Sequence, residues 1–67
     1  MKKEKIQIKR ILDYLKGIGE WQSTSSIAEI TGIHYYRAEK LLNGLFSRGL
    51  VEKDEKGRFV FWKLKEK

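Results

Sequence analysis

The stretch Thr31–Leu45 constrains the fold of this chain more than any other part of the sequence. It reads TGIHYYRAEKLLNGL, a short glycine-containing segment followed by an amphipathic pattern. Counted from Ala38 at about 100° per residue, three leucines lie within roughly 60° of it, which is the spacing of a helix with one buried face: Leu41, Leu42 and Leu45. The opposite face carries aromatic, basic and amide side chains, namely Tyr36, Lys40 and Asn43. We therefore predict a helix over 35–48 whose polar face is free to contact a partner.

A second helix is predicted directly before this one. The residues from Ser23 to Ser26 all carry hydroxyl groups, which are favoured at helix N-caps, and apolar residues follow at helical spacing. Ser26 has the capping-box spacing with Glu29, but a start at Ser23 is equally consistent with the pattern. Gly32 can adopt the left-handed conformation that stops a helix. A helix over 24–31, a turn and a further helix are the sequence form of a helix-turn-helix.

The flanking segments complete a small domain. Apolar residues at helical spacing predict a first helix over 3–16, which Gly17 is expected to end. A short strand is expected over 20–22. Near the C-terminus, Gly57 separates two strand-like runs and is expected to supply the positive φ of a hairpin turn within 50–64. The second run places three apolar residues on one face, which we expect to point into the core: Val60, Trp62 and Leu64.

Composition argues against several classes of function. The chain has 67 residues, which is enough for one small domain, and it has no Cys and a single His, so neither a metal site nor a cofactor is expected. No apolar run approaches the roughly 20 residues that span a bilayer, and we expect a soluble cytoplasmic protein without membrane contact. No nucleophile and base lie at a recognisable spacing, and no small-molecule site is evident, so an enzyme is not expected.

The charge of the chain favours a polyanionic partner. Lys plus Arg number 15 and Asp plus Glu number 9, which gives a net charge of +6, and the isoelectric point is about 9.7. Such a charge promotes association with nucleic acid. The charged surface of a thermophilic protein is a second explanation, because Lys and Glu are abundant while Gln and Asn are few. That origin does not exclude nucleic-acid binding.

Four motifs run through the predicted elements. They are Ile27-Ala28-Glu29-Ile30-Thr31-Gly32-Ile33, Ala38-x-x-Leu41-Leu42-x-x-Leu45, Arg48-Gly49-Leu50-Val51 and Gly57-Arg58-x-Val60-x-x-x-Leu64. With the order helix, strand, helix, helix, strand, strand, the chain resembles the winged helix-turn-helix superfamily over nearly its whole length. The last two motifs are similar to those of small prokaryotic and archaeal transcriptional regulators, archaeal viral ones included. The resemblance implies an α+β fold of three helices and a small antiparallel sheet, in the order α-β-α-α-β-β.

The resemblance also implies sequence-specific binding of double-stranded DNA. In that superfamily the third helix enters the major groove, the hairpin or wing lies along an adjacent groove or the backbone, and the start of the second helix meets phosphate. Carried onto this sequence, the candidates on the third helix are His34, Tyr35, Tyr36, Arg37, Lys40 and Asn43. Those on the wing and at the start of the second helix are Lys53, Lys56, Arg58 and Ser25. Arg37 and Lys40 can donate to guanine or phosphate, and Asn43 can pair with adenine.

Some of these candidates have a structural alternative. Tyr35 lies close enough to the apolar face to sit at the edge of the core, and His34 is often a helix cap or a surface residue at such a position. The wing lysines can be plain solubilising charges. For Tyr36 and Lys40 the alternative is a plain solvated helix face, and these two are the firmest candidates.

Trp62 and the Phe46-x-x-Gly49 region are also similar to winged-helix domains that bind left-handed duplexes. Those domains place an Asn and a Tyr on the third helix and prolines before the wing Trp. The corresponding helix positions here are Glu39 and Asn43, and the chain has no Pro. We therefore assign Trp62 to the core.

A protein-interaction module within a transcription or other assembly is the alternative function. Such a module needs an exposed apolar patch, which Phe59, Phe61 and Ile6 can supply. Ile6 lies outside the apolar stripe of the first helix, so it belongs either to a frayed helix end or to a dimer contact. A homodimer would read two half-sites, and both monomer and dimer stay open. RNA is a third partner to consider.

Overall fold

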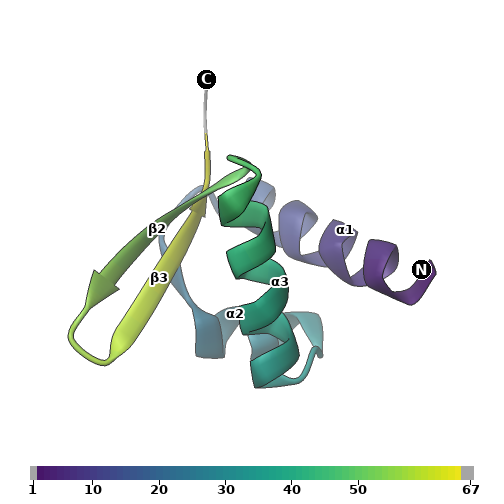
Figure 1. The fold of residues 1–67 in the computed structure, drawn as a ribbon, viewed down its shortest axis with the longest axis horizontal. Coiled ribbons are helices and arrows are strands. Elements are labelled where there is room, and N and C mark those ends of the chain that lie inside the picture. Colours follow the sequence, from purple (N-terminus) through teal and green to yellow (C-terminus); the bar gives the residue numbers. More distant parts are fainter. Residues whose placement is uncertain (1, 66–67) are drawn as a thin grey trace.

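The computed structural model of the protein describes residues 2–65 and contains three helices and one three-stranded antiparallel sheet (Figure 1). In chain order the elements are α1 (Lys2–Ile18), β1 (Gln22–Ser23), α2 (Thr24–Thr31), α3 (Tyr35–Ser47), β2 (Val51–Lys56) and β3 (Phe59–Leu64). This order confirms the predicted α-β-α-α-β-β arrangement. None of the helices in the described part of the chain combines the length and the apolar character needed to cross a membrane.

The end of α1 differs from the prediction. The helix continues through Gly17 to Ile18, and Gly19 then takes a φ of +64°, with its N–H donating to the carbonyl oxygen of Leu15 at 3.1 Å. The expectation that Gly17 ends this helix is therefore wrong. A helix interior tolerates a glycine at a cost of about 1 kcal/mol, whereas the left-handed residue after the helix strongly favours one.

The caps of α2 and α3 settle two alternatives that the sequence leaves open. Ser23 is the N-cap of α2, because its Oγ accepts a hydrogen bond from the N–H of Ser26 at 3.1 Å. Gly32 ends α2 with a φ of +72°, as predicted. His34 caps α3, and its Nδ1 accepts a hydrogen bond from the N–H of Tyr36 at 3.3 Å. Each capping side chain satisfies a backbone donor that the first turn of a helix leaves unpaired.

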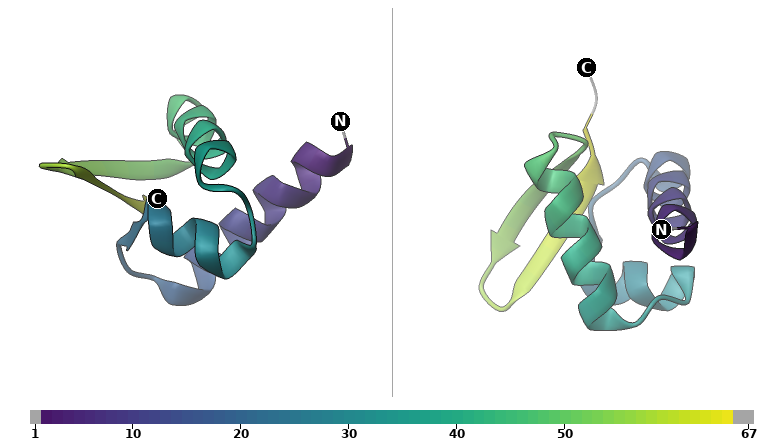
Figure 2. Two further views of the ribbon diagram at one scale, coloured as in Figure 1. Left: turned by 90° about the horizontal axis from the view of Figure 1, so that it is seen from below. Right: turned by 45° about the vertical axis from the view of Figure 1, so that its right-hand side comes forward.

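The central strand of the sheet is β3, which pairs antiparallel with β1 on one side and β2 on the other. Trp62 lies opposite Gln22 in β1 and opposite Lys53 in β2, so these three residues form one row across the sheet. Gly57 makes the hairpin turn with a φ of +61°, as predicted. Figure 2 shows the hairpin of β2 and β3 projecting beyond the helices.

The core lies between the three helices and the inner face of the sheet. It consists of Ile11, Leu15, Ile27, Ala28, Ile33, Ala38, Leu41, Leu42, Leu45, Val51 and Trp62, with Val60 and Leu64 packed against it. Trp62 is fully buried, and its Nε1 donates to the Oγ1 of the buried Thr24 at 2.8 Å. The assignment of Trp62 to the core is confirmed. This contact fixes β3 of the wing against the start of α2. The core therefore sets the position of the wing relative to α2.

Candidate nucleic-acid interface

Aromatic side chains gather at the N-terminal end of α3. The rings of Tyr35 and Tyr36 meet edge to face with their centroids 5.5 Å apart, and the ring of His34 lies 5.8 Å from that of Tyr36. Tyr36 is 72% exposed, and Lys40, one turn further along, is also exposed. We call Tyr36 and Lys40 the α3 ridge. It presents a hydroxyl, an aromatic face and an ammonium group to solvent.

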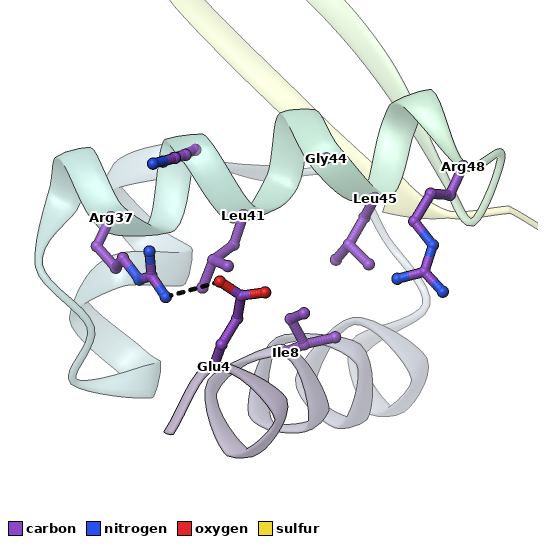
Figure 3. A pocket seen from close by; sticks show the side chains of 8 residues that line it. Glu4, Ile8, Arg37, Leu41, Gly44, Leu45 and Arg48 are labelled. Carbon is purple, nitrogen blue, oxygen red and sulfur yellow. Dashed lines mark hydrogen bonds and ion pairs between the residues drawn. The ribbon is translucent and has the colours of Figure 1, made fainter. Parts of the chain in front are cut away.

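Arg37 does not share this ridge. Its Nε donates to the Oε1 of Gln7 at 3.1 Å, and its Nη2 pairs with Glu4 Oε1 at 3.1 Å (Figure 3). The guanidinium turns toward α1 and is already engaged there, so the contact of Arg37 with guanine or phosphate stays a prediction. Both partners lie 30 or more positions upstream, so helical periodicity within α3 gives no sign of them.

Asn43 is likewise held by the protein itself. Its Nδ2 donates to the backbone carbonyl of Glu39 at 3.1 Å, and its Oδ1 accepts from the Nζ of Lys53 at 3.1 Å. The amide therefore already uses a donor and an acceptor, the two groups with which it was expected to read adenine. The contact joins α3 to β2.

Lys53 is a connecting residue and not a solvent-facing charge of the wing. Its Nζ also pairs with Glu55 Oε2 at 3.2 Å, and it lies 5.7 Å from the ring centroid of Phe46 and 5.4 Å from that of Trp62. The side chain is 23% exposed. An ammonium within about 6 Å of an aromatic face is attracted to the ring electrons. The Lys53 ammonium is therefore already engaged within the protein, and its contact with phosphate stays a prediction.

The remaining candidates face solvent. Lys56 is exposed and lies 3.6 Å from Asp54 Oδ2, a surface pair of small energetic weight. Arg58 follows the turn glycine and is exposed, and within residues 3–65 its side chain makes no ion pair. Ser25 is exposed in the first turn of α2. We call Lys56 and Arg58 the wing tip.

The sequence reasoning missed a groove between α1 and α3. It has a volume of about 240 Å³, with an apolar floor of Ile8, Leu41 and Leu45 and with Arg37 and Arg48 toward its two ends (Figure 3). Gly44 lies in the middle of its α3 wall. A signal was present in the sequence: a glycine in a helix interior, with basic residues four positions to either side. Among the described residues no three metal-ligating side chains come together.

Residues 7–66 match the family described as FaeA-like protein. The chain belongs to this family. Its fold is also that of the Zalpha domain from Carassius auratus PKZ, which was crystallised in complex with Z-DNA. The TM-score is 0.81 at 22% identity, and the match covers 92% of this chain and 97% of that domain. The FaeA-like chain therefore has a winged helix-turn-helix fold, as the sequence predicts. No curated protein sequence matches it.

In this FaeA-like protein the structure brings some predicted site residues together and separates others. Tyr36 and Lys40 lie on one exposed face of α3, and the Lys53–Asn43 contact places β2 beside that helix. Arg37 belongs instead to the α1 side of α3. The candidate interface thus has a central ridge, a wing on one flank and the groove on the other.

Proposed function

We propose that this FaeA-like protein is a transcriptional regulator that binds double-stranded DNA sequence-specifically, with the α3 ridge in the major groove and the wing tip on the adjacent backbone. One observation carries the proposal. Lys53 joins β2 to Asn43 at 3.1 Å, so the exposed ridge of α3 and the cationic wing adjoin. Two surfaces in this arrangement suit the base edges and the phosphates of one duplex.

The chemistry of these surfaces supports the proposal. An α-helix fits the major groove, where a lysine can donate to guanine acceptors or to a phosphate, and a tyrosine can contact a phosphate or a thymine methyl group. Cations on the wing displace counterions from phosphates, which gives affinity without sequence preference. The net charge of +6 favours the encounter. The Zalpha domain with the same fold was crystallised with a nucleic-acid duplex.

The test is a titration of the protein with random-sequence duplex DNA, single-stranded DNA and RNA at two salt concentrations. We expect the duplex to bind most tightly and the affinity to fall steeply with salt. Selection from a random duplex pool should then enrich one sequence. A left-handed duplex of alternating dC and dG is a further arm, and preference for it would contradict the assignment to right-handed DNA.

Two variants map the interface. Lys40→Ala and Arg58→Ala should each weaken duplex binding about tenfold and flatten the salt dependence by about one unit of slope. Arg10→Ala is the matched control, because it removes the same charge from an exposed position on the α1–α2 side of the molecule. If all three variants bind like the unchanged protein, the proposed interface is wrong.

A protein-interaction function is the second candidate, and one observation favours it. Phe59 is 63% exposed, and its ring lies 6.5 Å from that of Phe61 on the outer face of β3. Ile6, also exposed, lies on α1, at the opposite side of the molecule from the wing (Figure 1), and so does not extend this patch. Absence of salt-sensitive binding to all three nucleic acids would favour this candidate.

A further inference from the structure

The flank of α3 that faces away from the wing has an unusual composition. Arg37, Lys40, Gly44 and Arg48 line the α3 wall of the groove described above, and Glu4 and Ile8 line the α1 wall (Figure 3). Glu4 already neutralises Arg37 at 3.1 Å. Within residues 3–65 the side chains of Lys40 and Arg48 make no ion pair. Two uncompensated cations therefore lie one helical turn before and one turn after Gly44.

Neither the packing nor the backbone conformation of the domain requires a glycine at position 44. Gly44 lies inside α3, one turn before the C-cap Arg48, and glycine within a helix lowers its stability relative to alanine. A Cβ added at this position would meet no heavy atom within 4 Å apart from its chain neighbours and the adjacent helix backbone. The backbone there also lacks the positive φ that favours glycine elsewhere in the chain. The missing side chain therefore leaves open space on the surface of α3, between Lys40 and Arg48.

The open space at Gly44 can be compared with the width of the major groove of DNA. A helix with its side chains is about 10–12 Å across, and the major groove of B-form DNA is about 12 Å wide. A helix inserted there comes close to both backbones at once. The wing lies beside one flank of α3, and Gly44 lies on the other flank, where the groove has a cationic rim and an apolar floor.

We propose that a phosphodiester backbone passes closest to the protein at Gly44, where the absent side chain admits it and Lys40 and Arg48 hold it from either side. This inference rests on the proposed function and names the second strand contact of that interface. Eight residues of helix separate the two cations, about 12 Å, so both reach one strand as it crosses α3. Gly44 and Arg48 are then DNA-contact residues of this chain.

The first test uses side-chain size at position 44. Gly44→Ala should raise the melting temperature by about 4 °C and yet weaken duplex binding. Gly44→Leu should weaken it more, about tenfold or beyond, without unfolding the protein. Gly17→Leu is the matched control, because Gly17 also lies in a helix with open space at its Cβ, but in α1. This control should bind duplex like the unchanged protein.

The second test uses charge. Arg48→Ala should flatten the salt dependence of duplex binding by about one unit of slope, whereas Arg10→Ala should leave it unchanged. Wild-type affinity for duplex in Gly44→Leu, or equal effects of the two arginine variants, would overturn the inference while leaving the proposed function in place. Absence of duplex binding by the unchanged protein would instead refute the proposed function itself.

Discussion

At the residue scale, one buried hydrogen bond joins α2 to the wing. Trp62 is fully buried, and its Nε1 donates at 2.8 Å to the Oγ1 of Thr24, which is 2% exposed. Thr24→Val keeps the shape of the side chain but removes the acceptor, so we expect the free energy of unfolding to fall by about 1–3 kcal/mol. Urea unfolding followed by tryptophan fluorescence measures the change. Thr24→Ser keeps the hydroxyl and should lose less; equal or larger losses in the serine variant would argue against the hydrogen bond as the cause.

A second residue-scale prediction concerns the ion pair between Glu4 and Arg37, whose atoms are 3.1 Å apart. Glu4→Gln removes the charge that competes with phosphate for this guanidinium. We expect tighter duplex binding and a salt dependence steeper by up to about 0.9 units of slope, the contribution of one phosphate contact. Because both side chains are partly exposed, folding stability should change little. Glu20→Gln is the charge-matched control, in the loop before β1, and a similar gain there would show a non-specific effect.

At the element scale, Lys53 connects the wing to α3 and to the core. Its contacts are a hydrogen bond to Asn43 at 3.1 Å and the rings of Phe46 and Trp62 at 5.7 and 5.4 Å. Lys53→Met keeps an apolar stem but removes the ammonium group, and we expect a loss of about 1 kcal/mol in stability. Backbone amides of β2 and β3 should also exchange their hydrogens faster, because the hairpin is less firmly attached to the helix.

The matched control for this variant is Lys56→Met in the same strand. The Lys56 side chain is 72% exposed, and its pair with Asp54 at 3.6 Å contributes little to stability. Hydrogen exchange in the wing should therefore stay at the wild-type rate. Similar acceleration in both lysine variants would mean that the contacts of Lys53 do not hold the wing in place.

Local sequence patterns predict the elements well, and the reason is physical. The repeat of apolar residues in α3 and the alternation in β3 follow from backbone geometry, which acts over a few residues. Gly32 and Gly57 mark turns because a positive φ favours glycine wherever it occurs. The prediction that Gly17 ends α1 is wrong because glycine also occurs inside helices. Only the hydrogen bond from the N–H of Gly19 to the carbonyl oxygen of Leu15 shows where α1 ends.

At the scale of the whole molecule, the salt dependence of binding counts the phosphates that the protein neutralises. The α3 ridge, the wing tip and the flank near Gly44 together offer four cations: Lys40, Arg48, Lys56 and Arg58. At about −0.9 per phosphate on B-form DNA, the logarithm of the affinity should fall against that of salt concentration with a slope of about −3.6. Titration across a range of salt concentrations measures it. A slope near zero would contradict the whole interface. A slope near −2.7 would mean that only three of the four cations contact phosphate.

The sequence by itself determined the α-β-α-α-β-β order, the buried face of α3, the hairpin turn and the place of Trp62 in the core. These features depend on short-range periodicity and on the rarity of a fully apolar stripe at a surface. The sequence also predicted that Tyr36 and Lys40 are exposed, as they are in the structure. Only the tertiary structure decided which polar residues are already engaged, because partners such as Glu4 and Arg37 meet through packing and lie 33 positions apart in the chain.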